Sequence, residues 1–216
     1  MNTSPAIFLD RDGTLVEPRH YPSRPEELIL YPNIAPQLRR LRQDGFRLVV
    51  ITNQSGIARG LFSEDDLTRM HDDLRLRLQR LGVEMDSFYH CPHHPEGVIP
   101  ELAITCGCRK PEPGLLLAAA TDLSIDLTRS WFIGDILNDV EAGNRAGCRT
   151  ILVDLGTELP PASPLRTPHY VARDTEHALR IVRAVERCGP AVDTSYLPSS
   201  WLPNQAAGAQ LIGRSA

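Results

Sequence analysis

The sequence predicts an α/β fold, with one Rossmann-like parallel sheet and helices on both of its faces. Short apolar or β-branched runs alternate with helical patterns from residue 6 to residue 188, which is typical of βαβ units. The run 48–52 is apolar at almost every position, as expected for a strand buried on both faces. With 216 residues the chain is long enough for one well-cored domain and too short for two ordinary ones.

The elements alternate in a regular order. Strands are expected over residues 6–10, 46–52, 86–90, 130–135, 149–155 and 169–172, and helices over 34–45, 63–82, 113–124, 138–147 and 174–189. The helix over 63–82 has the clearest local signals, because Ser63 and Asp66 form a capping-box pattern at its start. Apolar residues recur along it at helical spacing and are expected in the core: Leu67, Met70, Leu74, Leu78 and Leu81.

The regular pattern ends at Cys188, which is expected to close the last helix. Residues 1–188 are therefore interpreted as one continuous domain. Residues 189–216 are rich in Pro, Gly, Ala and Ser without a sustained period, and a mostly disordered tail is expected there. Trp201 leaves open the alternative that part of this tail docks on the domain or on a partner.

Composition argues against several classes of function. A net charge of -4 and a pI near 6.0 argue against a general nucleic-acid binder, so no nucleic-acid partner is expected. No stretch approaches the roughly 18 apolar residues of a membrane span, and the first residues carry no signal-peptide pattern, so we expect a cytoplasmic protein without a membrane partner. Five cysteines, an odd number, argue against a disulfide framework in a reducing compartment. Cys148 is expected to pack as a small apolar residue.

The first predicted strand ends in two closely spaced carboxylates. Asp10 and Asp12 precede Gly13 and Thr14, which gives the pattern D-x-D-G-T. Such carboxylates repel each other unless a cation or a proton lies between them, so the spacing indicates a Mg²⁺ site. The matching chemistry is attack by Asp10 on a phosphoryl group, with Asp12 protonating the leaving oxygen and later activating water. Gly13 permits the unusual backbone conformation of the turn. A surface turn with two capping acids is the alternative.

Polar residues also follow the second predicted strand. Thr52 ends that strand, and Asn53, Gln54 and Ser55 come next. A hydroxyl with neighbouring amides and free backbone N–H groups forms a neutral cradle for phosphate. We therefore expect Thr52 to contact the phosphoryl group and the three residues after it to bind substrate.

A third carboxylate and two cations complete the candidate site. Asp135 ends a predicted strand directly after Gly134, and its convergence on the first two carboxylates would make an oxygen-rich Mg²⁺ site. Lys110 supplies the cation that balances charge on the phosphoryl group. Arg109 stands beside it, and a planar guanidinium suits a second, non-reacting phosphate. Because ligands of open α/β sheets bind beyond the carboxyl ends of the strands, these groups are expected to meet there.

The segment 91–108 combines thiols with imidazoles. Cys91, Cys106 and Cys108, with either His93 or His94, can close a tetrahedral Cys₃His site for structural Zn²⁺. Four protein ligands leave no open coordination position, so the catalytic ion is expected to be a separate Mg²⁺. One buried cysteine with two surface thiols and solvated imidazoles is the alternative.

These motifs together resemble the haloacid dehalogenase superfamily of phosphatases. The resemblance covers residues 6–188 and follows the motif order D-x-D-G-T at residues 10–14, Thr52, Lys110, and then Gly134-Asp135 with Asp139. The segments AIFLDRDGTL, TNQSGIARG, CPHHP and CRKP narrow it to the heptose bisphosphate phosphatases, the sugar phosphatases of bacterial heptose biosynthesis. The histidinol-phosphate phosphatases are the nearest relatives of that family.

The resemblance implies a role for each matching residue. Asp10 is the nucleophile, Asp12 the proton donor, and Arg109 recognises the distal phosphate of the substrate. Thr52 and Lys110 stabilise the phosphoryl group. The implied Mg²⁺ ligands are Asp10, Asp12 and Asp135, and the implied Zn²⁺ ligands are Cys91, His93, Cys106 and Cys108. The implied reaction removes the 7-phosphate of a heptose 1,7-bisphosphate through an aspartyl-phosphate.

The family has no large cap domain, and only 41 residues separate Asp10 from Thr52 here. We therefore expect the substrate to be a small phosphorylated sugar that enters an open cleft. The protein is expected to be a monomer. The family's substrate loop corresponds to residues 18–21, PRHY, which places His20 and Tyr21 at the substrate although the loop departs from the family pattern. Ile136 stands where a polar residue is expected. A histidinol-phosphate phosphatase, a nucleic-acid 3'-phosphatase and a non-catalytic zinc-loop binding module are the alternatives.

Overall fold

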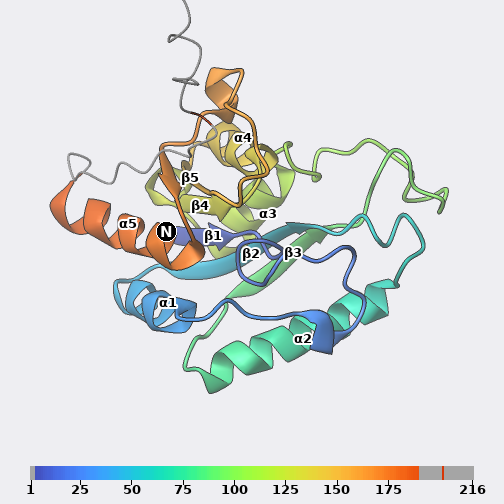
Figure 1. Cartoon of the computed structure of the whole chain (residues 1–216), viewed down its shortest axis with the longest axis horizontal. Helices are drawn as coiled ribbons and strands as arrows, with labels where there is room; N and C mark the ends of the chain where they lie inside the picture. The colour runs from blue at the N-terminus through green and yellow to red at the C-terminus, as the bar shows by residue number, and fades with distance from the viewer. Residues whose placement is uncertain (1–2, 190–200, 202–216) are drawn as a thin grey trace, which may run out of the picture.

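A six-stranded parallel sheet forms the centre of the molecule (Figure 1). The structure, a computed structural model, describes residues 3–189 and 201. The strands lie in the order β3-β2-β1-β4-β5-β6. Their bounds are β1 Ala6–Leu9, β2 Arg47–Asn53, β3 Ser87–Cys91, β4 Trp131–Gly134, β5 Arg149–Val153 and β6 Tyr170–Ala172. Each of the six overlaps a predicted strand, which confirms the expected parallel sheet.

Helices connect the strands and also follow the predicted order. Their bounds are α1 Ile34–Gln43, α2 Glu64–Arg80, α3 Gly114–Leu123, α4 Leu137–Ala146 and α5 Thr175–Cys188. Three single 3₁₀ turns were not predicted: η1 Pro25–Glu27, η2 Leu127–Arg129 and η3 Pro164–Arg166. Among the described residues no further domain is inserted, so the expectation of a sheet domain without a large cap is confirmed.

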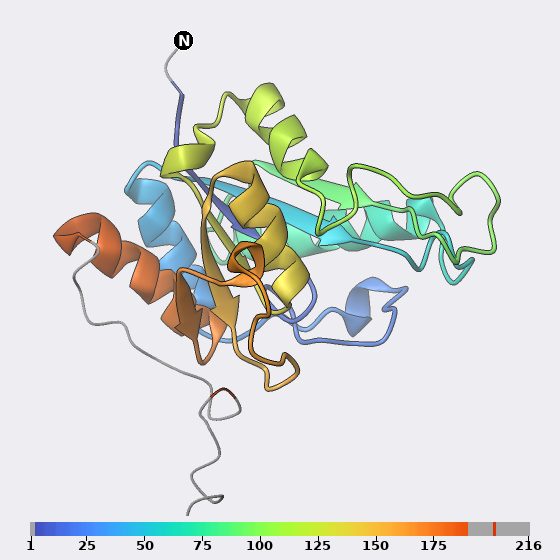
Figure 2. The ribbon, with the colours of Figure 1, turned by 90° about the horizontal axis from the view of Figure 1, so that it is seen from above.

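The helices form a layer on each face of the sheet (Figures 1 and 2). Ile7 and Leu9 of β1 belong to the core cluster that also contains the buried faces of α1, α2 and α5. Ala6 and Phe8, which alternate with them, belong to the cluster with residues of α3 and α4. All four side chains are fully buried, because successive residues of a strand point to opposite faces and both faces are covered here.

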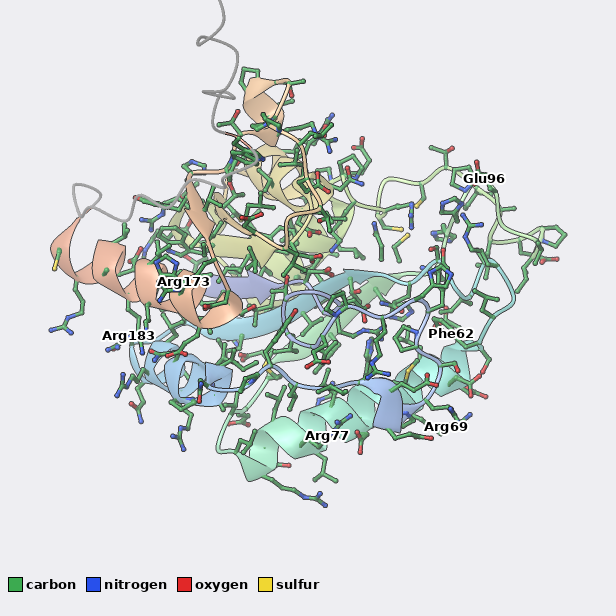
Figure 3. The ribbon with its side chains drawn as sticks, viewed as in Figure 1. Phe62, Arg69, Arg77, Glu96, Arg173 and Arg183 are labelled. Carbon is green, nitrogen blue, oxygen red and sulfur yellow. The ribbon has the colours of Figure 1, made fainter. Side chains whose placement is uncertain are left out.

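Helix α2 begins as its sequence predicts. Ser63 Oγ accepts the N–H of Asp66 at 3.1 Å, and Asp66 Oδ2 accepts the N–H of Ser63 at 2.8 Å, which confirms the capping box. Four residues of the apolar stripe are buried, but the prediction for Leu81 is wrong. Leu81 is the C-cap of the helix and is 49% exposed, because the chain leaves the helical path there. Arg77, further along the same helix and labelled in Figure 3, donates to the carbonyls of Pro25 and Leu28.

The strand order brings distant segments to one edge of the sheet. The chain runs outward from β1 through β2 to β3 and then crosses back to β4, so β1 lies between β2 and β4. Leu9 at the end of β1 pairs with Val50 on one side and with Ile133 on the other. The carboxyl ends of these three strands are therefore neighbours, at the reversal of strand order where ligands of such sheets bind.

The expectations for Cys148, Cys188 and the C-terminal tail can also be compared with the structure. Cys148 is buried in the core cluster with α3, and Cys188 ends α5 and is exposed, both as expected. Most of the predicted 189–216 tail lies outside the described residues. Trp201, which is described, packs against an apolar cluster that includes Leu137 and donates its indole N–H to the carbonyl of Glu158.

Within the described part of the chain, every helix is too short or too polar to cross a membrane.

Candidate active site

Three carboxylates and one ammonium form the charged centre of the site. Asp10 follows β1, Asp135 follows β4, and Asp139 lies in the first turn of α4. One carboxylate oxygen from each lies within 4.8 Å of the other two. Lys110 Nζ lies 2.7 Å from Oδ1 of Asp10 and 2.6 Å from Oδ1 of Asp139, and it donates to the carbonyl of Ile51. We call Asp10, Asp135, Asp139 and Lys110 the charged cluster, and all four side chains are buried.

Burial and crowding perturb these groups strongly. Burial, together with the neighbouring acids, raises the pKa of Asp10 to about 7 even though Lys110 opposes the shift. Burial and the charges of Asp10 and Asp139 raise the pKa of Asp135 to about 9. Burial alone would lower the pKa of Lys110, but the two carboxylates it contacts outweigh burial and the pKa is raised. When all three carboxylates are ionised, they exceed the one ammonium by two negative charges, which is the charge that a divalent cation neutralises.

Two glycines let the carboxylates approach the backbone. Gly13 has φ +83, and a Cβ placed there would lie 2.2 Å from Oδ2 of Asp135. At Gly134 a Cβ would lie 2.3 Å from the Cβ of Asp139. The unusual backbone predicted at Gly13 is confirmed, and the structure adds the close approach of Asp135 as a second reason for glycine.

Asp12 lies apart from the charged cluster. Among the described residues, the carboxylates that gather are those of Asp10, Asp135 and Asp139, without that of Asp12. Oδ2 of Asp12 instead accepts from two nitrogens of Arg11, at 3.0 and 2.8 Å, and from Gln54 Nε2 at 3.1 Å. Asp12 is thereby held at the rim of the cluster with one of its oxygens fully engaged.

The end of β2 and the residues after it contact both Asp12 and Lys110. Gln54 Nε2 also donates to Oγ1 of the buried Thr52 at 2.8 Å, so one amide orients both side chains it contacts. Asn53 Oδ1 accepts the N–H of Lys110 at 3.0 Å, and Asn53 Nδ2 donates to the carbonyl of Lys110 at 3.1 Å. This pair of hydrogen bonds fixes the backbone from which Lys110 enters the charged cluster. Ser55 is buried beside them.

A cavity of about 210 Å³ opens beside Asp12. It joins the segment after β1 to the segment after β2, and its lining consists of Arg11, Asp12, Arg19, His20, Tyr21, Pro22, Asn53, Gln54 and Ser55. Five of the six predicted substrate-binding residues line it, all except Arg109: His20, Tyr21, Asn53, Gln54 and Ser55. Tyr21 adopts a positive φ of 49, unusual for a bulky residue, and His20 packs edge-on against its ring at 4.6 Å. We call this the 20–55 cavity.

The thiols and one imidazole of the 91–108 segment converge. The distances between the Sγ atoms of Cys91, Cys106 and Cys108 are 3.2 to 3.6 Å, and His93 Nδ1 lies 3.3 Å from Cys108 Sγ and 3.6 Å from Cys91 Sγ. We call these four residues the Cys₃His cluster. His94 points elsewhere and contacts Arg59.

The structure also places Arg109 and Ile136, two residues that the sequence analysis singled out. Arg109 Nη1 donates to the carbonyl of His93 at 3.2 Å, so Arg109 contacts the main chain of the 91–108 segment and is not part of the lining of the 20–55 cavity. Ile136 donates its backbone N–H to Asp139 Oδ2 at 3.3 Å. Because that contact uses the main chain, the apolar side chain at Ile136 does not prevent it.

Sequence reasoning missed three residues of this region. Asp139 appears in the motif pattern but was assigned no role, and its position three residues into a helix after Gly134-Asp135 is the signal that could have identified it. Arg19 lines the 20–55 cavity, and its place in the predicted substrate loop 18–21 is the signal that could have identified it. Arg11 lies between the two motif carboxylates and is fully buried, which its sequence position alone does not indicate.

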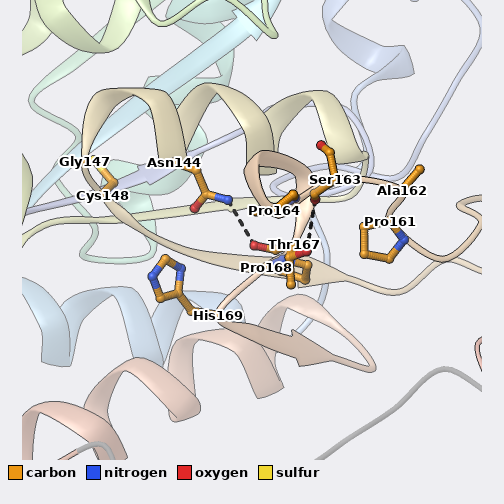
Figure 4. Close-up of a pocket in the computed structure, with 10 residues that line it drawn as sticks. All are labelled: Asn144, Gly147, Cys148, Pro161, Ala162, Ser163, Pro164, Thr167, Pro168 and His169. Atoms are coloured by element: carbon orange, nitrogen blue, oxygen red, sulfur yellow. Dashed lines mark hydrogen bonds between the residues drawn. The ribbon is translucent and has the colours of Figure 1, made fainter.

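A cavity larger than the 20–55 cavity lies elsewhere in the molecule. It measures about 790 Å³ and is bounded by the end of α4 and by residues 161–169 (Figure 4). Asn144 Nδ2 donates to the carbonyl of Thr167 across its floor. None of the charged cluster lines it, so its size does not make it the candidate active site.

Comparisons with known proteins show that this chain is similar to phosphatases. The HAD-hydrolase-like family model matches residues 107–178. The D-glycero-beta-D-manno-heptose-1,7-bisphosphate 7-phosphatase of Yersinia pestis is 42% identical over 70% of this chain and 81% of its own. The D-glycero-alpha-D-manno-heptose-1,7-bisphosphate 7-phosphatase of Photorhabdus laumondii is 35% identical over 82% of this chain and 91% of its own. The crystal structure of the D,D-heptose 1,7-bisphosphate phosphatase of B. bronchiseptica, complexed with magnesium and phosphate, has a TM-score of 0.70 and 32% identity, covering 83% of this chain and 98% of that one.

Proposed function

Because this chain belongs to the haloacid-dehalogenase-like hydrolases, in the family of the heptose-1,7-bisphosphate 7-phosphatases, we propose that it removes the 7-phosphate of D-glycero-D-manno-heptose 1,7-bisphosphate. The observation that carries the proposal is the buried contact between Asp10 and Lys110 at the carboxyl end of the central strand. It provides a nucleophile beside a cation in a water-poor site, as phosphoryl transfer requires.

The reaction is proposed in two steps. A carboxylate oxygen of Asp10 forms a bond to phosphorus, and the bond between phosphorus and the sugar oxygen breaks as Asp12 gives that oxygen a proton. Asp12 then takes a proton from a water molecule whose oxygen attacks the aspartyl-phosphate. The bond between phosphorus and Asp10 breaks, which restores the carboxylate and releases phosphate.

Lys110 and Thr52 are proposed to hold the phosphoryl group. The Lys110 ammonium is already fixed between two carboxylates, so little reorganisation is needed when negative charge develops on the phosphoryl oxygens. The Thr52 hydroxyl accepts a hydrogen bond from Gln54 and keeps its own proton to donate.

The charged cluster fits a Mg²⁺ ion. Its two surplus negative charges and its buried carboxylate oxygens are the donor set that a hard divalent cation prefers. We propose that Asp10 and Asp135 hold Mg²⁺ while Asp139 balances Lys110. Asp12, which the resemblance also implies as a ligand, lies outside the charged cluster with Oδ2 bound by Arg11 and Gln54, and we assign its carboxylate to proton transfer. When bound, the ion would neutralise the phosphoryl oxygens.

The Cys₃His cluster fits a structural Zn²⁺. Ligands at about 2.3 Å from a tetrahedral zinc lie about 3.8 Å from one another for sulfur pairs, and the observed separations of 3.2 to 3.6 Å are close to that value. Burial raises the pKa of the Cys91 thiol, so a bare cluster would hold that sulfur as a protonated thiol. We propose that Zn²⁺ stabilises the segment before Lys110 and takes no part in the reaction.

The sugar is proposed to occupy the 20–55 cavity. Its lining combines the ring of Tyr21, the amides of Asn53 and Gln54 and the guanidinium of Arg19, which suits a hydroxylated and phosphorylated ligand. We keep Arg109 as the proposed ligand of the distal phosphate. Arg19 lines the cavity directly and is the structural competitor for that role.

The proposal is tested by comparing substrates. Values of kcat/KM should be highest for heptose 1,7-bisphosphate, assayed as both anomers, and far lower for histidinol phosphate, which has no second phosphate. A far higher efficiency with histidinol phosphate would contradict the proposal. Cytoplasmic location, a monomeric state and the absence of a nucleic-acid partner stay predictions.

Variants of Arg109 and Arg19 test which arginine binds the distal phosphate of the substrate. Arg109→Ala should lower kcat/KM for the bisphosphate at least about tenfold while leaving the heptose 7-monophosphate much less affected, because only the bisphosphate loses a charge-assisted contact. Arg19→Ala is the matched comparison. If Arg19→Ala shows the larger bisphosphate-specific loss, Arg109 is not the distal ligand.

A further inference from the structure

Arg11 is a buried cation that the proposed reaction does not use directly. It lies between the two motif carboxylates in sequence, and its side chain is completely inaccessible to solvent. Its guanidinium contacts Oδ2 of Asp12 with two nitrogens, Gln54 Oε1 at 2.9 Å and His71 Nε2 at 3.5 Å. A charge buried this deeply requires partners on every side, and these three residues are its partners.

The two carboxylate oxygens of Asp12 have different hydrogen-bonding environments. Oδ2 accepts three N–H groups, two from Arg11 and one from Gln54. Oδ1 is buried and has no hydrogen-bond partner among the described residues. A buried acceptor left open is costly, so it marks the oxygen that a substrate or water would contact. Oδ1 is therefore the oxygen of Asp12 available for proton transfer.

His71 supports Arg11 from the neighbouring helix. It lies on α2, is 7% exposed, and packs against the ring of Phe88 at 5.0 Å. Burial, and then the charge of Arg11, lower its pKa to about 3, so its imidazole is neutral at physiological pH. A neutral imidazole has one nitrogen free to accept, and Nε2 is the one that faces Arg11.

We propose that His71 is a positioning residue, whose Nε2 holds the Arg11 guanidinium against Asp12 so that Oδ1 is aimed at the leaving oxygen. This inference rests on the proposed phosphatase function and assigns a role to a residue 60 positions away from Arg11 on a different element. His71 touches neither the substrate nor the charged cluster in this scheme. Its effect reaches the reaction only through the orientation of the proton donor.

The test compares two leaving groups in variants of His71. A sugar or other alkyl oxygen needs a proton from Asp12 as it leaves, whereas 4-nitrophenolate leaves without one. His71→Phe keeps an aromatic ring against Phe88 but removes the acceptor. It should lower kcat for alkyl phosphates about tenfold, with little change in KM and much less change in kcat for 4-nitrophenyl phosphate. His71→Gln places an oxygen acceptor at similar reach and should restore the alkyl-phosphate rate.

The controls separate positioning from general damage. His90→Gln changes a histidine whose ring lies 6.0 Å from that of His71 and which bonds Glu64, not Arg11, so the ratio of the two rates should stay at the wild-type value. If His71→Phe does not fold, as judged by its thermal transition, His71→Leu takes its place. Equal losses for both leaving groups, or no recovery in His71→Gln, would overturn the proposal. Because any alkyl phosphate that the wild type hydrolyses can serve, failure of the heptose assignment would leave this test intact.

Discussion

Nζ of Lys110 lies 2.7 Å from Oδ1 of Asp10, although the two residues are 100 positions apart in the chain. Both side chains are buried, and Asp139 shares the same ammonium at 2.6 Å. The contact orients the proposed nucleophile and favours its ionised form against the cost of burial. The remaining charge imbalance is the reason that a divalent cation is proposed at this site, and the predictions below follow from these relationships.

Asp10→Asn should abolish turnover while preserving the fold. An amide cannot form the aspartyl-phosphate, so kcat should fall by more than about 10³-fold. The change also removes one of the crowded carboxylates, so the thermal transition without Mg²⁺ should not decrease. Asp72→Asn, on the exposed side of α2, is the control for the same chemical change and should keep wild-type kinetics. Substantial activity in Asp10→Asn would contradict the assignment and would favour another nucleophile.

Lys110→Met should destabilise the Mg²⁺-free protein by about 3–5 kcal/mol, because it leaves buried carboxylates without their partner. Urea unfolding in the presence of EDTA measures this loss. Adding Asp139→Asn to the same chain should recover part of the stability but none of the activity. A single variant as stable as the wild type would show that the ion pairs with Lys110 do not stabilise the fold.

Mg²⁺ should stabilise the protein more at pH 8 than at pH 6. The pKa of Asp10 is raised to about 7 and that of Asp135 to about 9, from about 3.9 in an unfolded chain. The folded state therefore retains protons that the unfolded state has lost, so the stability from these groups is present below about pH 4 and is lost as pH rises toward 7 and 9. Mg²⁺ offsets that loss by binding the ionised carboxylates. Thermal transitions with EDTA or Mg²⁺ at the two pH values measure the effect, and equal shifts would contradict it.

Gly13→Ala should inactivate the enzyme more than it destabilises the fold. The new Cβ would lie 2.2 Å from Oδ2 of Asp135 at a positive φ, so Asp135 or the turn must move. The apparent Mg²⁺ affinity, measured from activity against Mg²⁺ concentration, should weaken together with kcat. Gly45→Ala is the control, since it shares a positive φ but has nothing within 4 Å of the added carbon. Equal losses of activity in the two variants would show that the positive φ, and not the contact with Asp135, causes the loss in Gly13→Ala.

Cys108→Ser should impair zinc content, folding and substrate affinity together. Cys108 is two residues before Lys110, whose backbone is also held by Asn53, so loosening the Cys₃His cluster should loosen the segment that carries the cation. Metal analysis, thermal unfolding and KM provide the three readouts. Cys148→Ser is the comparison for a buried thiol outside the cluster. Normal zinc content with normal kinetics in Cys108→Ser would contradict a structural clamp.

Much of the fold could be predicted because its signals are local. The capping pair Ser63 and Asp66 and the apolar spacing along α2 depend only on residues within a few turns of one another. Leu81 shows the limit of that argument. It continues the apolar spacing, but the helix has already ended, and exposure is decided by where the chain turns next.

The same limit applies to the candidate site. The D-x-D-G-T pattern indicates carboxylate chemistry at the first strand, but Asp12 alone cannot reveal that its oxygen is bound by Arg11. Likewise Asp139 could be any acid near the start of a helix until β4 is placed beside β1. Arg19 enters the 20–55 cavity only because the segment after β1 folds back against the segment after β2.

By itself the sequence determined the order of strands and helices along the chain, the carboxylates and thiols of the two candidate sites, and the family. Those features depend on residue type and short-range spacing. Only the tertiary structure decided which charges meet: Lys110 with Asp10 and Asp139, and His71 with Arg11. The physical reason is that the lateral order of the strands and the packing of the helices bring these partners together. The pKa and the contacts of a buried charged group depend on all of its neighbours, which only the folded structure places around it.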